Sequence, residues 1–133
     1  MSVAVAWSQR PVVLVAEDDD DLRDALADAL RAGLGARVVA VGTARQALAA
    51  AREAPPDLAV LDAGLPGLDG WALARDLKAD PETAWMPLVG LSGIGAGGGA
   101  LARAAGFDAY LGKEQVGQLT TVVRGLLQPV MAA

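Results

Sequence analysis

The sequence predicts an α/β fold in which a single five-stranded parallel sheet carries helices on both faces. Two observations lead to this prediction. Short, continuous apolar runs alternate with longer stretches whose apolar residues recur every three or four positions, and the alternation repeats five times in 133 residues. Continuous apolar runs are typical of parallel strands that are buried on both faces, and right-handed crossovers then place helices on either side.

The first strand and the first helix are expected directly after Pro11. Residues 12–16, "VVLVA", form a largely β-branched apolar run, which favours a central strand. Residues 20–35, "DDLRDALADALRAGLG", place apolar side chains at helical spacing and therefore predict an amphipathic helix. The stretch offers two candidate N-caps and two candidate stops: Asp19, Asp20, Gly33 and Gly35.

The next two units repeat this pattern. Residues 36–42, "ARVVAVG", predict the second strand, and residues 43–54, "TARQALAAAREA", predict a helix that two prolines close. Residues 57–62, "DLAVLD", predict a third strand. A stretch rich in turn-forming residues follows, and residues 71–80, "WALARDLKAD", return to helical spacing.

The last two units complete the sheet. Residues 86–92, "MPLVGLS", predict the fourth strand, and a glycine-rich stretch from residue 93 leads into a short helix that ends by residue 106. Residues 107–113, "FDAYLGK", predict the fifth strand. Residues 114–127, "EQVGQLTTVVRGLL", carry apolar side chains on one face and predict the closing helix.

Composition excludes several classes of site. The chain has no cysteine and no histidine, so disulfides, thiolate or imidazole metal sites and cysteine nucleophiles are excluded. Its net charge is −5 and its basic residues are scattered, which argues against direct binding of nucleic acid. No run approaches the roughly 20 apolar residues that span a bilayer, and no export signal is recognisable, so we expect no membrane contact and a cytoplasmic protein.

Charged and polar side chains stand at the ends of four predicted strands. Open parallel sheets bind ligands outside the carboxyl ends of their strands, near the point where strand order reverses. In the order 2-1-3-4-5, four of these ends are neighbours. Three acids, one hydroxyl and one ammonium are then expected in a single crevice: Glu17, Asp18, Asp62, Ser92 and Lys113.

This set of groups suits a hard cation and phosphate chemistry. Carboxylate oxygens without nitrogen or sulfur are ligands that Mg²⁺ accepts, and Glu17, Asp18 and Asp62 would supply them. A carboxylate can also attack phosphorus when a cation screens its charge against the incoming group. A lysine and a hydroxyl would hold the remaining phosphoryl oxygens.

Four segments together resemble one family. They are the acidic pair after the first strand, "DLAVLDAGLPGLDGW" around Asp62, "PLVGLSG" ending the fourth strand, and "DAYLGK" in the fifth. Asp18, Asp62, Ser92 and Lys113 are separated by 44, 30 and 21 residues in turn. Over about residues 11–128 the chain resembles a bacterial response regulator receiver domain. The resemblance implies a flavodoxin-like, doubly wound fold and a stand-alone receiver over residues 1–133, with residues 1–10 as an N-terminal extension.

The resemblance also implies a phosphorylation site. Asp62 would accept a phosphoryl group from a phosphohistidine on a sensor histidine kinase or a histidine phosphotransfer protein. Asp18 and Asp62 would bind Mg²⁺ together with the carbonyl of Gly64, while Glu17 would act mostly through a bound water. Lys113 would pair with the phosphoryl group, and the protein would catalyse only its own phosphoryl uptake and loss rather than act as an enzyme.

A switch is implied next to that site. Ser92 would move toward the phosphate on activation, with help from the N–H groups of Ala63 and Gly93, and Tyr110 would rotate inward to fill the vacated space. The face formed by the fourth helix, the fifth strand and the fifth helix would report the change to an unknown protein target. A local charge event would thus bias an element with two states.

Two features depart from the family. Glu114 stands where a proline usually follows the lysine, so either the peptide bond is trans and the loop is rebuilt, or a strained cis bond is retained. The glycine-rich stretch from residue 93 to 99 replaces a polar, helix-forming sequence and predicts a fraying or shifted fourth helix.

Two other functions remain open from the sequence. A pseudo-receiver that takes no phosphate and serves as a docking module draws support from Glu114 and the glycine-rich stretch. A Mg²⁺-dependent phosphatase of the aspartyl-phosphate kind is less favoured, because Gly64 stands where such enzymes carry a second acid. Asp19, Asp20 and Asp21 are interpreted as the first turn of a helix, where anions are favourable.

Overall fold

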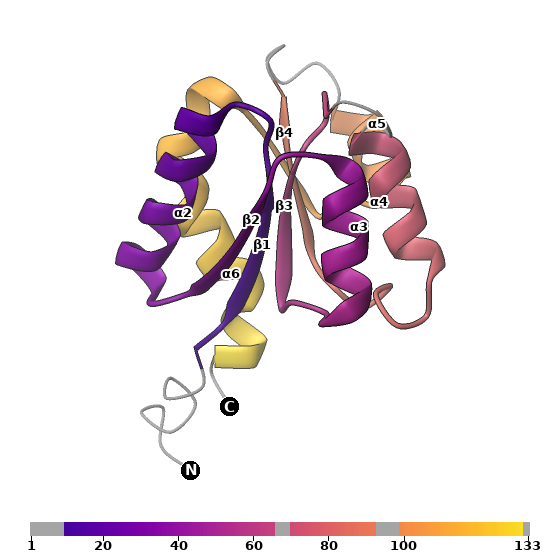
Figure 1. Ribbon diagram of the computed structural model, residues 1–133, viewed down its shortest axis with the longest axis horizontal. Helices are drawn as coiled ribbons and strands as arrows, with labels where there is room; N and C mark the ends of the chain where they lie inside the picture. Colours follow the sequence, from indigo (N-terminus) through magenta and orange to yellow (C-terminus); the bar gives the residue numbers. More distant parts are fainter. Residues whose placement is uncertain (1–9, 66–69, 93–98, 132–133) are drawn as a thin grey trace.

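The computed structural model describes residues 10–65, 70–92 and 99–131. The predicted alternation of strands and helices is present throughout these residues (Figure 1). The elements in chain order are β1 (Val12–Ala16), α2 (Asp20–Leu34), β2 (Arg37–Val41), α3 (Ala44–Glu53), β3 (Leu58–Asp62), α4 (Gly70–Ala79), β4 (Leu88–Ser92), α5 (Gly99–Ala105), β5 (Ala109–Gly112), the 3₁₀-helix η1 (Lys113–Gln118) and α6 (Leu119–Met131).

The strands form one parallel sheet in the order β2-β1-β3-β4-β5. Helices α2 and α6 cover one face of this sheet, and α3, α4 and α5 cover the other (Figure 1). The predicted fold class and strand order are therefore confirmed. Because all strands run in the same direction, their carboxyl ends meet along one edge of the sheet.

Strand β3 lies in the middle of the sheet and is buried along its whole length. Its side chains alternate between two apolar clusters. Val60 belongs to the cluster that contains residues of α2 and α6, whereas Leu61 belongs to the one that contains residues of α3 and α4. This double burial explains why β3 reads as a continuous apolar run, and it fixes the depth at which the strand ends on Asp62.

Helix α2 begins and ends at two of the four residues that the sequence offered. Asp19 is the N-cap, and its side chain accepts a hydrogen bond from the backbone N–H of Leu22. Gly35 ends the helix in the left-handed conformation with a φ of 63°, which is accessible to glycine without steric cost. The position of the first turn of α2 is thus set by Asp19, immediately after the acidic pair.

The segment after β5 differs from the prediction. The fifth strand ends at Gly112 rather than Lys113, and residues 113–118 form a 3₁₀-helix before α6 begins. The side chain of Gln115 accepts a hydrogen bond from the N–H of Gly112, which stabilises a tight turn at the place where an α-helix was expected. The peptide bond between Lys113 and Glu114 is trans. Of the two possibilities for Glu114, the loop is therefore rebuilt.

The structure describes only the last residue of the glycine-rich stretch at residues 93–99. Helix α5 begins at Gly99 and is seven residues long, so the short helix predicted after this stretch is present. The expectation that the stretch itself frays concerns residues 93–98, which lie outside the described residues, as does the N-terminal extension up to residue 9.

Candidate functional site

Asp62 is the last residue of β3 and is almost completely buried, with an exposed fraction of 3%. One carboxylate oxygen, Oδ1, accepts a hydrogen bond of 2.9 Å from the N–H of Gly64. The other, Oδ2, lies 3.1 Å from the ammonium nitrogen of Lys113. The strand end and these two contacts together fix the carboxylate at the carboxyl edge of the sheet.

Glu17 directly follows β1 and its side chain is fully buried. Its N–H donates to the carbonyl of Val41, so its backbone extends the pairing of β1 with β2. Its Oε2 accepts a hydrogen bond of 3.0 Å from the N–H of Asp19. Its Oε1 is the one buried side-chain polar atom among the described residues that has no hydrogen-bond partner.

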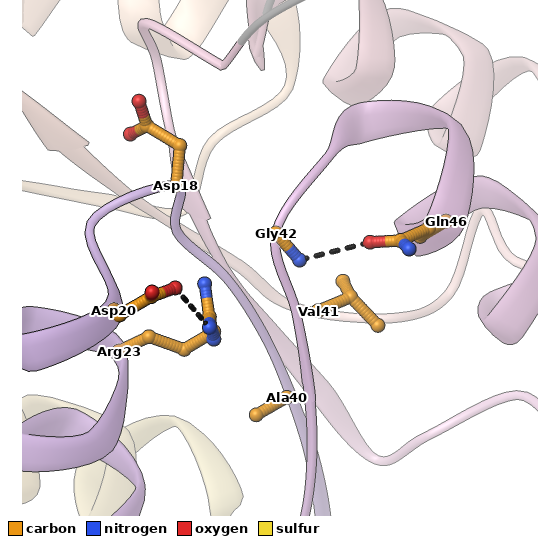
Figure 2. Close-up of a pocket in the computed structure, with 7 residues that line it drawn as sticks. All are labelled: Asp18, Asp20, Arg23, Ala40, Val41, Gly42 and Gln46. Carbon is orange, nitrogen blue, oxygen red and sulfur yellow. Dashed lines mark hydrogen bonds and ion pairs between the residues drawn. The ribbon is translucent and has the colours of Figure 1, made fainter.

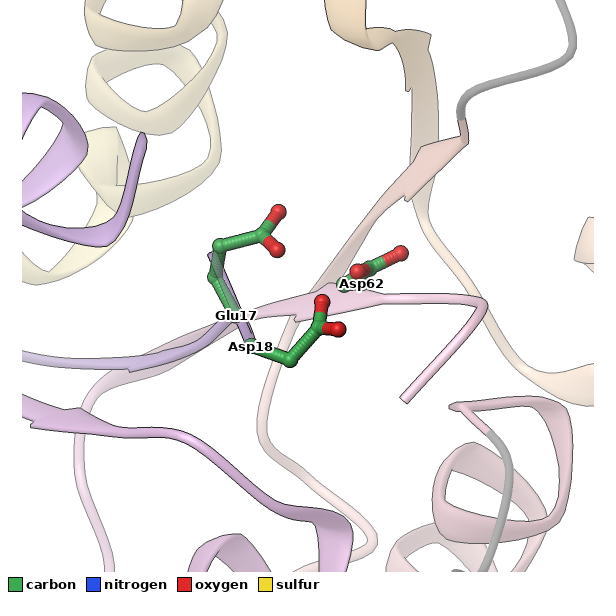
Figure 3. Close-up of side chains that lie close together, drawn as sticks. All are labelled: Glu17, Asp18 and Asp62. Carbon is green, nitrogen blue, oxygen red and sulfur yellow. The ribbon is translucent and has the colours of Figure 1, made fainter. Parts of the chain in front are cut away.

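Asp18 is exposed at the rim of the same edge. It lines an open depression beside the ends of β1 and β2 (Figure 2). Oxygen atoms of Glu17, Asp18 and Asp62 all lie within 4.8 Å of one another, and Figure 3 shows how the three carboxylates gather at the ends of β1 and β3. The convergence that strand order predicts is therefore present for these three acids.

Lys113 supplies a positive charge to this cluster from the turn after β5. Its Nζ lies 3.1 Å from Oε1 of Glu17 and 3.1 Å from Oδ2 of Asp62. These ion pairs join residues that are far apart in the chain, because β1, β3 and β5 end at the same edge. One ammonium does not balance three carboxylates, so the site retains an excess of negative charge.

Burial and charge shift the pKa values of these groups. Burial raises the pKa of the Glu17 carboxyl to about 7, because a carboxylate loses hydration there. A hydrogen bond with Glu17 is the main reason that the pKa of Asp18 is lowered. Burial opposes the charge of Lys113, but its contacts with Asp62 and Glu17 outweigh this effect and raise the pKa of the ammonium.

The cluster has the properties of a site for a hard metal ion. Its donors are carboxylate oxygens, and one of them, Oε1 of Glu17, is buried without a hydrogen bond. That oxygen lies 3.1 Å from the Lys113 ammonium, but one ammonium does not balance three carboxylates. A cation bound between the carboxylates would offset the remaining negative charge. The residues present therefore fit a metal ion of the oxygen-binding class.

Two further predicted site residues are placed by the strand register. Ser92 is the last residue of β4 and pairs with Gly112, the residue before Lys113, so its position at the same edge agrees with the prediction. Tyr110 lies on β5 opposite Gly90, and its ring packs against Trp71 with centroids 5.5 Å apart. Neither observation tests a movement of these side chains, which stays a prediction.

The backbone groups expected at the phosphate are only partly described. The N–H of Ala63 donates to the carbonyl of Leu91 at 2.8 Å, so a contact with phosphate requires this N–H to exchange its partner. Gly64 is held against Asp62 through its own N–H. The role of its carbonyl stays a prediction, and Gly93 lies outside the described residues.

Two residues near the site were missed by the sequence reasoning. A Cβ at Gly70, the first residue of α4, would overlap the carbonyl oxygen of Asp62, so glycine is what allows α4 to start this close to β3. Arg23 on α2 donates a hydrogen bond to the carbonyl of Glu17. A glycine after a turn and an arginine on a helix are both common, and nothing in a single sequence distinguishes them.

No helix within the described ranges combines the length and the apolar character that crossing a membrane requires.

Comparisons with known proteins agree with this geometry. The family model described as "Response regulator receiver domain" matches residues 13–124. The DNA-binding response regulator MtrA of Mycolicibacterium smegmatis is 42% identical over 73 residues, which cover 55% of this chain and 32% of MtrA. The KDP operon transcriptional regulatory protein KdpE of Escherichia coli is 36% identical over 118 residues, covering 87% of this chain and 51% of KdpE.

A solved structure extends the agreement to three dimensions. The signal receiver domain of a signal transduction histidine kinase from Syntrophus aciditrophicus superposes with a TM-score of 0.80 at 26% identity, covering 90% of this chain and 92% of that one. The chain spans about a third of MtrA and about half of KdpE, so it matches one part of these longer regulators. Across residues 13–124 the chain belongs to the response regulator receiver domain family of two-component signalling.

Proposed function

We propose that this receiver domain is a phosphoacceptor switch whose acceptor is Asp62. The phosphoryl group would come from a phosphohistidine on a sensor histidine kinase or a histidine phosphotransfer protein. The observation that supports this proposal best is the environment of the Asp62 carboxylate. It is buried at the edge of the sheet, 3.1 Å from the Lys113 ammonium, within a cluster of three acids whose charge this one ammonium does not balance.

The transfer uses groups that this chain provides. A carboxylate oxygen of Asp62 forms the new bond to phosphorus while the bond from phosphorus to the imidazole nitrogen breaks, and that nitrogen keeps the electron pair. Lys113 already contacts Asp62, so its ammonium is positioned to pair with a phosphoryl oxygen as negative charge arrives. The hydroxyl of Ser92, at the end of the neighbouring strand, would hold another oxygen.

We propose Mg²⁺ as the metal ion of the acidic cluster. Asp18, Asp62 and the carbonyl of Gly64 would hold it, and Glu17 would contribute mostly through water. The ion would supply positive charge against which a phosphoryl group can approach a carboxylate. The convergence of carboxylate oxygens of Glu17, Asp18 and Asp62 within 4.8 Å, with a single ammonium beside them, supports a cation in this position.

The proposal limits what the chain does on its own. It would catalyse only its own phosphoryl uptake and loss, and it would act on an unidentified protein target through the face formed by α5, β5 and α6. MtrA is named as a DNA-binding regulator, but this chain matches about a third of it. With a net charge of −5, we propose no direct contact between this chain and nucleic acid.

Intact mass spectrometry tests the acceptor. The wild-type chain, incubated with acetyl phosphate and Mg²⁺, should gain one phosphoryl group, whereas Asp62→Asn should gain none. Asp28→Asn is a matched control, because it removes an exposed carboxylate on α2 away from the site and should gain phosphate like the wild type. No gain in the wild type would favour the docking module, and a gain in Asp62→Asn would show that the acceptor is another residue.

A further inference from the structure

Arg23, the fourth residue of α2, links the turn that carries the acidic pair to the start of the helix. Its Nη1 donates a hydrogen bond of 2.9 Å to the backbone carbonyl of Glu17. Its Nη2 donates to the carboxylate of Asp20 on the same helix (Figure 2). The side chain is only 21% exposed, so the guanidinium is held between the helix and the turn rather than in solvent.

Several polar contacts fix Glu17, and Arg23 supplies the one on its carbonyl. The N–H of Glu17 donates to Val41 of β2, and its carboxylate accepts from the N–H of Asp19. Both of those contacts involve backbone groups of the neighbouring strand and turn. The carbonyl belongs to the peptide that leads into Asp18, so the orientation of this peptide depends on the guanidinium.

The end of β2 closes on the same guanidinium from the other side. A Cβ at Gly42 would lie 3.2 Å from Nη1 of Arg23, so glycine permits the strand end to approach. The N–H of Gly42 donates to the side chain of Gln46 at the start of α3. Asp18, Arg23 and Gly42 all line the open depression of about 510 Å³ beside the site (Figure 2). The guanidinium of Arg23 thus lies between the acidic turn and the end of β2.

We propose that Arg23 is a positioning residue for the cation site. By holding the carbonyl of Glu17, it keeps the peptide between Glu17 and Asp18 in the orientation that directs both carboxylates toward Asp62. This inference rests on the proposed binding of Mg²⁺ to the acidic cluster. Arg23 does not contact the cation in this assignment. It acts through Glu17 and Asp18, in the way that a residue behind a metal ligand orients that ligand without touching the metal.

Positioning and charge predict opposite effects of removing this side chain. A guanidinium close to a cation site repels the cation, so loss of its charge alone would tighten Mg²⁺ binding. Loss of the hydrogen bond to Glu17 would instead release the turn and weaken binding. The direction of the change in affinity therefore separates the two roles.

The same helix offers a matched control. Arg31 pairs with Asp28 at the same spacing as Arg23 with Asp20, but near the opposite end of α2 and on a more exposed side chain. Arg23→Gln and Arg31→Gln each remove one positive charge and one such ion pair. Only the first also removes the contact with the carbonyl of Glu17.

Calorimetric titration of the whole chain with Mg²⁺ tests the inference. The dissociation constant for Mg²⁺ should rise about tenfold in Arg23→Gln, the size expected for loss of a contact that orients a ligand, and should stay unchanged in Arg31→Gln. An unchanged or lower constant in Arg23→Gln, with a wild type that binds Mg²⁺, would overturn the positioning role alone. A wild type that binds no Mg²⁺ would overturn the proposed cation site and this inference with it.

A spectroscopic measurement separates positioning from a general loss of structure. The amide nitrogen of Asp18 belongs to the peptide whose carbonyl Arg23 holds, so its NMR shift should change in cation-free Arg23→Gln. The NMR shifts of the backbone amides in the strands of the sheet should stay as in the wild type. Widespread changes with no distinct effect at Asp18 would contradict the inference, because the loss of affinity would then follow from a disturbed fold.

Discussion

The carboxyl group of Glu17 is buried at the end of β1, and burial raises its pKa to about 7 from an ordinary value of 4.5. Between these two values the folded chain binds more protons than the unfolded chain. The free energy of unfolding of the cation-free protein should therefore be largest below pH 4.5 as far as Glu17 is concerned, and should fall as pH rises toward 7. The loss is on the order of 3 kcal/mol.

Urea unfolding between pH 5 and pH 8, without Mg²⁺, measures this effect. Glu17→Gln should remove most of the decline, because the amide stays neutral in the same place. Glu53→Gln, on the exposed side of α3, serves as the control and should keep the decline of the wild type. A slope that is equal in the wild type and in Glu17→Gln would show that another group is responsible.

Asp18 and Asp21 are both exposed acids of the same run, but they differ in what they face. Asp18 belongs to the carboxylate cluster, whereas Asp21 lies in the first turn of α2. Asp18→Asn should abolish Mg²⁺-dependent phosphorylation by acetyl phosphate, because a cation ligand is lost. Asp21→Asn should leave phosphorylation intact and lower the free energy of unfolding by at most about 1 kcal/mol, through the weaker helix N-terminus.

Two measurements check this pair: intact mass after incubation with acetyl phosphate and Mg²⁺, and urea unfolding monitored by circular dichroism. Phosphorylation of Asp18→Asn at the wild-type rate would show that Asp18 is not a ligand of the cation. A loss of phosphorylation in Asp21→Asn would mean that the whole acidic run acts in binding.

At the scale of elements, α4 and α6 each carry a glycine whose replacement should have an opposite effect. A Cβ at Gly70 would overlap the carbonyl of Asp62 and the Cα of Ala63, whereas a Cβ at Gly125 would meet nothing. Gly70→Ala should lower the free energy of unfolding by about 1–3 kcal/mol, as expected for an overpacked position. Gly125→Ala should raise it by about 0.5–1 kcal/mol, because alanine favours a helix interior.

Urea unfolding at one pH compares the two variants directly. Phosphorylation adds a second measurement, since α4 must shift away from Asp62 in Gly70→Ala and uptake of phosphate should slow. An equal free energy of unfolding in Gly70→Ala and the wild type would show that the start of α4 can move away from Asp62 without loss of stability.

Local rules predicted the elements well where one chemical cause dominates. The apolar run of residues 12–16 is β1, and Asp19 and Gly35 delimit α2, as cap chemistry and glycine geometry suggest. The closing helix shows the limit of such rules. Its apolar spacing includes Val116, but a hydrogen bond between Gln115 and Gly112 makes the first part a 3₁₀-helix. That bond depends on where β5 ends, which the spacing does not encode.

At the scale of the whole molecule, strand order explains why much of the site could be predicted. Once β1, β3 and β5 end at one edge, the ion pairs of Lys113 with Glu17 and Asp62 follow from the topology. The contribution of burial could not be read from the sequence, because Glu17 and Asp18 are neighbours in the chain and only one is enclosed. The same holds for Arg23, whose contact depends on the path of a turn.

An aromatic cluster packs beside β4 and β5. The rings of Trp71, Phe107 and Tyr110 pack against one another with centroids 5.5 to 5.9 Å apart. A Cβ at Gly90 would overlap the ring of Tyr110, so this ring lies directly over β4. Tyr110 is only three residues from Lys113, so we expect a change at Asp62 that moves Lys113 to act on the cluster as well.

Tryptophan fluorescence should therefore report phosphorylation. If Tyr110 rotates when Asp62 is phosphorylated, the environment of Trp71 changes, and the emission of the Mg²⁺-loaded chain should change on addition of acetyl phosphate. Asp62→Asn should show no change. Trp7 lies outside the described residues and is replaced by phenylalanine in every protein compared. Trp71→Phe, which keeps an aromatic ring in the cluster, should then also show none, because the remaining Trp85 lies 56% exposed in the turn before β4, away from this edge. The same emission change in Trp71→Phe as in the wild type would mean that the signal arises elsewhere and that the cluster does not follow the phosphorylation state of Asp62.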